Sequence, residues 1–202
     1  MRNPATRNRQ RRGFTLIELL TVIAVILILA GIMIPAIGGV LEGSRKASSR
    51  TQFQQYVIAI NNYRNTYGFW PPFLADGTAT DVSGAATSGD AQDFIRALTG
   101  RDLNGDVLSN TAADQNRRRK RFHTFGNDIL NDQLIDNGLG LSDTGAIYIA
   151  VDHDNDGLID DSEINTNVPN LDPLTADLRA SVAVWSIRSS DGALWAATFD
   201  IE

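Results

Sequence analysis

The sequence predicts an α+β fold, in which a long N-terminal α-helix packs on a small antiparallel β-sheet. An apolar run that begins at Phe14 continues into an amphipathic pattern that ends at Tyr67, which is typical of one helix in two environments. Three short runs rich in Val, Ile, Ala and Trp follow towards the end of the chain, as strands require. A helix followed by a group of strands indicates the α+β layout.

Length and composition limit the number of domains and the kinds of chemistry. The chain has 202 residues and a formal net charge of −6, so after one membrane helix it holds enough residues for one modest core. It contains no cysteine, which excludes a disulfide framework and thiolate chemistry. We therefore expect one globular domain that is stabilised by packing or by a metal.

The first 41 residues combine a basic leader with an apolar segment. Arg11 and Arg12 end the leader, Gly13 follows, and from Phe14 the only ionisable side chain in the next 20 residues is Glu18. About 20 apolar residues in a helix cross the hydrocarbon core of a bilayer. A carboxylate within that core costs on the order of 2.5 kcal/mol or more, so Glu18 requires a partner.

Other N-terminal segments share part of this pattern. A secretory signal also joins a basic region to an apolar one, and Arg11 with Arg12 could belong to a twin-arginine export signal. Both would end in a cleavage site of small residues after roughly 7–15 apolar residues, whereas this run continues to Leu41. A plain membrane anchor remains an alternative, but it explains neither Gly13 nor Glu18.

The segment Gly-Phe-Thr-Leu-Ile-Glu at residues 13–18, after a basic leader, resembles the N-terminus of type IV prepilins and type II secretion pseudopilins. The resemblance implies that a prepilin peptidase cleaves between Gly13 and Phe14 and methylates the new amine of Phe14. It also implies that Glu18 meets the N-terminal amine of Phe14 in a neighbouring subunit of a fibre. An opposite charge of this kind makes a carboxylate tolerable in an apolar environment.

The resemblance and the charges together predict the topology. The basic leader, residues 1–13, would lie in the cytoplasm, and residues 14–41 would form the membrane-spanning and assembly half of the helix. Residues 42–202 would form a pilin-like periplasmic domain that includes the amphipathic half of the helix, residues 42–67. Cleavage would leave 13 basic and 24 acidic residues, a formal charge of −11. Such a chain disfavours nucleic acid and favours cations.

The amphipathic half of the helix presents one apolar face to the domain core. The side chains on this face recur at helical spacing, and Gly68 with Pro71 and Pro72 predicts the end of the helix. The face consists of Phe53, Tyr56, Val57, Ile60, Tyr63 and Tyr67.

Four segments between the helix and the strands have simpler interpretations. Residues 76–89 are rich in small and polar residues and predict an exposed loop. Residues 90–98 predict a short helix with Asp90 as its cap and Phe94, Ile95 and Leu98 buried. Residues 102–106 predict a turn. The basic segment, residues 117–121, predicts a solvated stretch that pairs with carboxylates, in preference to a nucleic-acid site.

The predicted strands are residues 145–151, 181–187 and 193–199. The Asp-Gly pair at residues 191 and 192 predicts a tight hairpin between the last two strands. Strict alternation in the last strand would place four side chains on one face, against the helix. These side chains belong to Trp195, Ala197, Phe199 and Ile201.

Residues 152–163 match the twelve-position calcium loop without a gap. We call this segment the carboxylate loop. Its predicted ligands are Asp152, Asp154, Asp156, the carbonyl of Leu158, Asp160 through water, and both oxygens of Glu163.

The chemistry of the carboxylate loop favours calcium. Calcium accepts six to eight oxygen ligands, whereas zinc prefers nitrogen and sulfur, and Gly157 permits the sharp turn that the loop needs. His153 falls between ligand positions and is not counted. The segment before the loop reads as a strand instead of the helix of a paired EF-hand, which favours a structural site over a sensor. The alternative is an Asp-rich surface turn without an ion.

The sequence therefore indicates a structural protein, not an enzyme, most similar to a major pseudopilin of type II secretion. The resemblance implies a fibre of identical subunits, together with minor pseudopilins, a prepilin peptidase and an inner-membrane assembly platform. A type IV pilus subunit, with a role in adhesion, motility or DNA uptake, is the main alternative. The lack of a cysteine pair near the C-terminus disfavours many such pilins. A membrane-anchored protein of another class is the second alternative.

Overall fold

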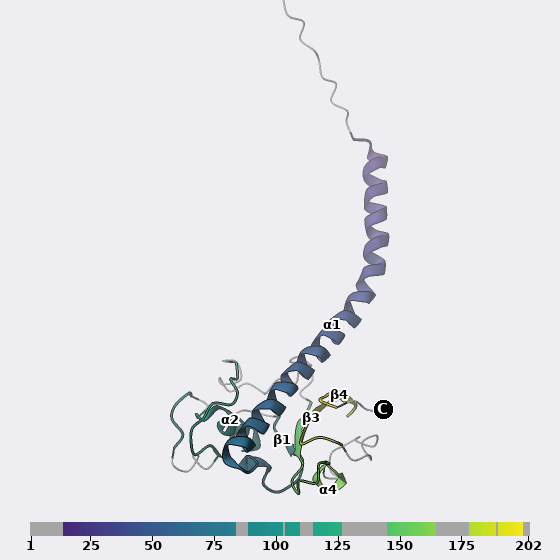
Figure 1. Cartoon of the computed structure of the whole chain (residues 1–202). Helices are drawn as coiled ribbons and strands as arrows, with labels where there is room; N and C mark the ends of the chain where they lie inside the picture. The colour runs from purple at the N-terminus through teal and green to yellow at the C-terminus, as the bar shows by residue number, and fades with distance from the viewer. Residues whose placement is uncertain are drawn as a thin grey trace, which may run out of the picture. The chain divides into compact units, whose positions relative to one another are not determined.

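The computed structural model describes residues 14–83, 89–102, 104–109, 115–126, 145–164, 178–188 and 190–199, and for residues 34–38 the backbone alone. The chain forms two compact units, residues 1–43 and 44–202 (Figure 1). Helix α1, Leu16–Tyr67, contributes residues to both. The predicted continuous N-terminal helix is thereby confirmed, with its end one residue before Gly68, whose φ is +82°.

The first unit contains the one stretch, among the described residues, that is long and apolar enough to cross a membrane. This stretch is Leu16–Met33, and none of it is buried against the rest of the protein. The large apolar side chains along it are between 49% and 81% exposed. An apolar surface of this size marks contact with lipid or with another protein.

The second unit contains a four-stranded antiparallel sheet in the order β1-β2-β3-β4. The strands are β1, Thr80–Asp81, β2, Ile147–Val151, β3, Val182–Ile187, and β4, Leu194–Ala197. The three predicted strands are confirmed. Strand β1 corrects the expectation of a loop at residues 76–89, because Thr80 pairs with Ile149 and Val82 is fully buried.

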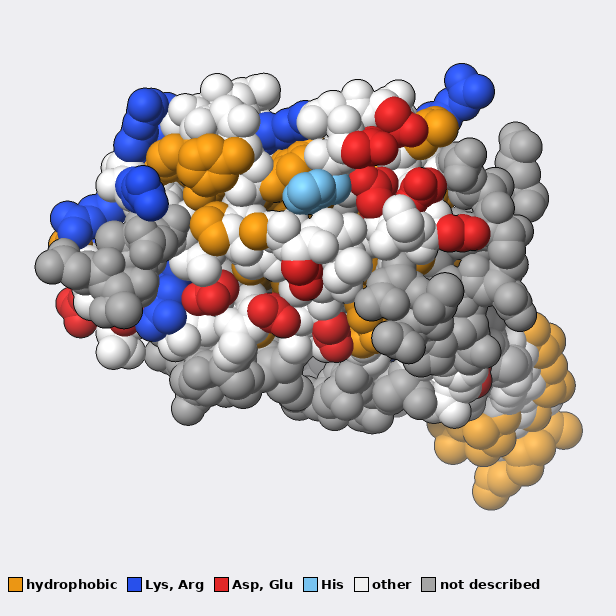
Figure 2. All heavy atoms as spheres, turned by 90° about the horizontal axis from the view of Figure 1, so that it is seen from below, with side chains coloured by type: hydrophobic (Ala, Val, Ile, Leu, Met, Phe, Trp, Pro, Cys, Tyr) orange, Lys and Arg blue, Asp and Glu red, His pale blue; other side chains and the backbone are white. Residues whose placement is uncertain are grey.

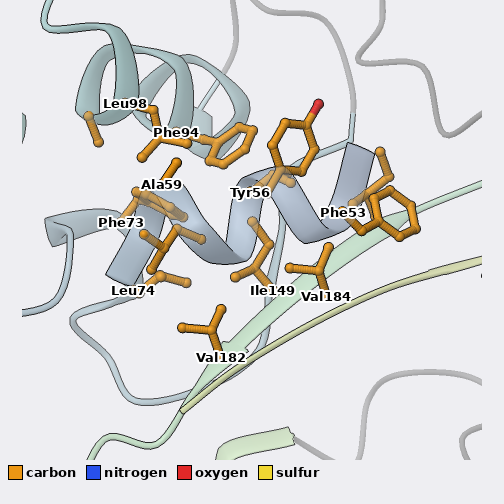
Figure 3. Close-up of a cluster of buried hydrophobic side chains, with 14 of the residues drawn as sticks. Phe53, Tyr56, Ala59, Phe73, Leu74, Phe94, Leu98, Ile149, Val182 and Val184 are labelled. Carbon is orange, nitrogen blue, oxygen red and sulfur yellow. The ribbon is translucent and has the colours of Figure 1, made fainter. Parts of the chain in front are cut away.

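Helix α1 supplies the centre of the core in this unit. The second half of α1 lies between α2, Gly89–Thr99, and the sheet, and its apolar face contacts both (Figure 3). Four side chains of the predicted face are fully buried, while Val57 and Tyr67 pack against them partly exposed. The four are Phe53, Tyr56, Ile60 and Tyr63. Tyr56 and Phe94 meet edge to face with ring centres 5.1 Å apart, a favourable aromatic geometry.

The connecting segments agree with their predictions in outline. A 3₁₀ turn, η1, Pro72–Leu74, follows α1, and Phe94, Ile95 and Leu98 of α2 are buried as predicted. Asp90 lies within the first turn of α2 and is not its cap, because the helix begins one residue earlier, at Gly89. The turn after α2 is confirmed, since the Gly105 N–H donates to the carbonyl of Asp102 at 2.8 Å.

Strand β4 departs from the predicted alternation at Trp195. Ser186 pairs with Ala196 but Ile187 pairs with Leu194, so Trp195 is an extra residue in the ladder. A bulge of this kind shifts the period of the strand. Trp195 and Ala196 consequently both join the core on the α1 side, whereas Ala197 and Phe199 pack on the opposite face with Trp185. Ile201 lies outside the described residues.

Candidate functional site

The predicted assembly residues meet at the start of α1. The backbone N–H and the hydroxyl of Thr15 both donate to Oε2 of Glu18, each at 2.8 Å. In return, the backbone N–H of Glu18 donates to the Thr15 hydroxyl at 3.3 Å. This reciprocal arrangement is a capping box, which satisfies donors that the first turn of a helix leaves unpaired. Thr15 therefore supplies the Glu18 carboxylate with two hydrogen bonds from the same chain.

Thr15 is a hydrogen-bond partner of Glu18 that was not among the predicted site residues. The pattern of a threonine followed three residues later by a glutamate, just before an apolar run, is the recognised signal for a capping box. Phe14 precedes the box and is 79% exposed. Gly13, the predicted residue on the leader side of the cleavage site, lies outside the described residues.

The second candidate site is the carboxylate loop, which begins where β2 ends. β2 delivers Asp152 to the loop, and the backbone N–H of Asp152 donates to the carbonyl of Ser181 beside it. The loop leads into the short helix α4, Asp161–Ile164. Ile159 pairs with Leu178 through two backbone hydrogen bonds of 2.8 and 3.0 Å. The loop is thus held at its start, its middle and its end.

Three of the predicted ligands converge. Carboxylate oxygens of Asp152, Asp154 and Asp156 all lie within 4.8 Å of one another. Asp152 is only 5% exposed, and its buried Oδ1 has no hydrogen-bond partner among the residues that the structure describes. Its other oxygen accepts the N–H of Gly157, which adopts a φ of +90° that side chains disfavour. A buried carboxylate oxygen without a donor is costly and suits a cation ligand.

The remaining predicted ligands have different surroundings. Glu163 is 7% exposed, and its two oxygens accept the backbone N–H groups of His153 and Asp160, so it connects the two ends of the loop. Asp160 accepts hydrogen bonds from the hydroxyl and the N–H of Ser162, which lower the pKa of Asp160. For Leu158, the N–H donates to Asp156 at 2.8 Å. All of the predicted metal-binding atoms are oxygens, which calcium prefers as ligands.

The carboxylate loop is also connected to the segment that follows α1. The indole N–H of Trp70 donates to the backbone carbonyl of Asp152 at 2.9 Å, and this contact is buried. The guanidinium of Arg64 lies 4.0 Å from the centre of the Trp70 ring. Both residues line a pocket of about 380 Å³ together with His153 and Asn155. This connection could not be predicted from local sequence patterns, because the partners lie 82 positions apart.

The basic segment, residues 117–121, is exposed along its whole length, as predicted. The Arg118 and Arg119 side chains donate to the backbone carbonyls of Thr66 and Leu108 at 3.5 and 3.3 Å, whereas the predicted pairing was with carboxylates. The segment begins after Asn116, which is fully buried. The Asn116 side chain donates to the carbonyls of Ala97 and Lys120 and thereby fixes the segment to α2.

Residues 8–34 match the family model described as the prokaryotic N-terminal methylation motif. The match covers the end of the leader, Gly13, Phe14, the capping box and the apolar stretch of α1. It confirms the resemblance seen in the sequence and is consistent with the type IV pilin and pseudopilin family. No curated protein and no solved structure matches the chain.

Proposed function

Because the chain carries a prokaryotic N-terminal methylation motif at the head of a pilin-like α+β fold, we propose that it is a structural subunit of a type II secretion pseudopilus. In this role it polymerises through α1 into a short periplasmic fibre that supports protein export. The single observation that carries the proposal is the motif at residues 8–34, which continues without interruption into the helix that forms the domain core.

The residues of the motif have separate tasks in the proposed assembly. A prepilin peptidase removes residues 1–13 and methylates the amine of Phe14. The Glu18 carboxylate then exchanges part of its capping-box contact with Thr15 for the charged amine of Phe14 in a neighbouring subunit. Two opposite charges stabilise each other strongly where lipid excludes water. The capping box keeps the carboxylate hydrogen-bonded until the neighbour arrives.

The proposed location follows from the same segment. The stretch Leu16–Met33 holds the subunit in the inner membrane as a single span, with its basic leader in the cytoplasm and its second unit in the periplasm. Its partners are other copies of the chain, minor pseudopilins, the prepilin peptidase and the inner-membrane assembly platform. The role is structural and requires no catalytic residue.

The proposal is tested by deleting the gene in the source bacterium and restoring it on a plasmid. A pseudopilus subunit predicts that secreted proteins accumulate in the periplasm of the deletion strain and return to the medium after restoration. Unchanged secretion together with the loss of surface filaments, adhesion or DNA uptake would instead identify a type IV pilus subunit. Intact-mass measurement of the restored chain should give a species that begins at N-methylated Phe14.

We further propose that the carboxylate loop binds one structural calcium ion. The support is that every predicted ligand atom is an oxygen, that Asp152, Asp154 and Asp156 converge, and that no donor among the described residues satisfies the buried Oδ1 of Asp152. Asp160 and Glu163 would complete the set, with the Leu158 carbonyl. An ion there would offset the repulsion of the crowded carboxylates and so stabilise the loop that holds Trp70.

A further inference from the structure

The described part of the second unit carries a basic cluster and an acidic cluster at separate places on its surface (Figure 2). We infer that neighbouring copies of the chain contact each other head to tail, with the basic segment of one copy, residues 117–121, against the carboxylate loop of the next. This inference rests on the proposed fibre and names a contact between the globular units, in addition to the contact through α1.

The basic segment is an ordered cluster of like charge. All five of its residues are basic and exposed. The Tyr67 hydroxyl accepts the N–H of Arg118 at 2.8 Å, and Phe122 donates its N–H to the carbonyl of Leu98 at 2.8 Å. Gly100 lies so close that a Cβ there would be 2.5 Å from the carbonyl carbon of Arg119. The backbone is therefore fixed on α2, and the charges keep a defined position.

The carboxylate loop supplies the opposite charge. Its side chains at Asp154, Asp156 and Asp161 are exposed, whereas those of Asp152 and Glu163 are buried. The loop contains six carboxylates in all, so one bound divalent cation would leave it acidic. Asp161 is exposed and is not among the proposed calcium ligands, which makes it the residue that can report on the contact separately from the metal.

The two charged segments are attached to different layers of the second unit, although both lie near the C-terminal end of α1. The basic segment packs on α2, and the carboxylate loop continues from β2, while the second half of α1 lies between α2 and the sheet (Figure 3). Seen from below, most of the Lys and Arg side chains gather at one end of the face, and Asp and Glu side chains occupy its centre and other end (Figure 2). A single copy cannot bring these two segments together.

A repeating assembly can bring them together. Copies that follow one another by a constant rotation and translation place one side of each domain against a different side of the next. A surface that is basic on one side and acidic on the other is complementary to itself under this operation and repels copies in the wrong register. The same charges would be screened by salt, because both segments are exposed.

The test uses disulfide formation between copies of the full-length chain in the source bacterium. The chain has no cysteine, so every disulfide between copies must come from introduced residues. A chain that carries both Lys120→Cys and Asp161→Cys should form a ladder of covalent multimers after mild oxidation. Neither single variant should form disulfide-linked species after oxidation. Co-expression of the two single variants should give disulfide-linked dimers and no larger covalent species. Lys120→Cys with Asp90→Cys, an exposed acidic position on α2, is the matched control and should give no ladder.

Charge reversal provides the second measurement. Lys120→Glu with Arg121→Glu should reduce the fraction of the chain that sediments as polymer, and Asp161→Lys in the same chain should restore it. Equal unfolding midpoints of the variants would show that they fold. If the wild type polymerises but the double cysteine variant forms no ladder of covalent multimers, this inference is wrong while the proposed fibre stands. A wild-type chain that never polymerises would instead overturn the proposed function. Weaker binding to anionic vesicles, without rescue by Asp161→Lys, would assign the basic segment to the membrane surface and also overturn the inference.

Discussion

Trp70 donates its indole N–H to the backbone carbonyl of Asp152, and so connects the exit of α1 to the first residue of the carboxylate loop. The contact is buried and spans 82 positions of sequence. Two segments that the sequence presents as separate features, an aromatic helix exit and an acidic loop, are therefore parts of one structure.

Replacing Trp70 with Phe should lower the free energy of unfolding by about 1–3 kcal/mol, because the buried carbonyl of Asp152 would lose its donor. The measurement is unfolding of the detergent-solubilised chain, followed by near-ultraviolet circular dichroism. Trp195→Phe is the matched control, since the Trp195 N–H lies 3.4 Å from the Ser49 hydroxyl, at the long limit of a hydrogen bond. Equal losses in the two variants would show that the Trp70 contact has no special weight.

Calcium should raise the unfolding temperature of the second unit, and magnesium should do so less. Binding to the folded state alone contributes RT ln(1 + [L]/Kd), which is about 2.7 kcal/mol at a 100-fold excess over Kd. Asp154→Ala should abolish the difference between calcium and chelator, because it removes one of the three converging carboxylates. Asp161→Ala, the exposed neighbour outside the ligand set, should retain it. Equal midpoints of the wild type in calcium and in chelator would leave the segment an Asp-rich turn without an ion.

Glu18→Ala should insert into the membrane at least as well as the wild type but assemble poorly. Insertion becomes easier by on the order of 2.5 kcal/mol, since the apolar stretch loses its one carboxylate, whereas the neighbouring amine loses its counter-charge. The measurement compares the chain in the membrane fraction with the chain in sedimented polymer. Thr21→Ala is the control, because the Thr21 hydroxyl donates to the backbone carbonyl of Glu18 and not to its carboxylate. Normal polymer from Glu18→Ala would exclude Glu18 as the assembly contact.

Stability should decrease as the pH falls below about 6.5, in part through His123. The His123 ring meets Tyr56 and Phe125 edge to face, and burial there lowers its pKa. The folded state therefore binds a proton less readily than the unfolded state. The contribution is complete above the unfolded pKa and is lost as the pH falls through the folded one.

The measurement for His123 is the midpoint of urea unfolding between pH 5 and pH 8 for the wild type and for His123→Gln. The variant should show a shallower decline over this range, whatever its stability at pH 8. Parallel curves for the two chains would assign the decline to carboxylates instead.

Local periodicity accounts for what the sequence could predict. Residues of α1 recur at helical spacing from Phe53 to Tyr63, and this pattern needs no knowledge of the partner surface. The runs that become β2 and β3 are almost entirely apolar, and both strands are buried. The carboxylate loop could be recognised because its predicted calcium ligands lie at fixed positions along one continuous segment.

Contacts between distant segments account for what the sequence could not predict. Strand β1 has two residues, and Thr80 becomes a strand residue only through its pairing with Ile149. The extra position of Trp195 depends on the register of β4 against β3, so strict alternation assigned Ala197 to the wrong face. The buried side chain of Asn116 fixes a polar segment whose composition alone indicates only solvent exposure.

The residues that β4 adds to the core set how much of the chain must be synthesised before that core can close. Trp195 and Ala196 join the same core as Phe53, so the core closes across about 140 positions of sequence. A ribosome releases α1 before β4, and contacts of such long separation form slowly. A nascent chain that has released α1 but not β4 is anchored in the membrane while its aromatic core is incomplete. Premature termination before Leu194 would then leave a membrane-bound subunit with an open core, a natural substrate for quality-control proteases.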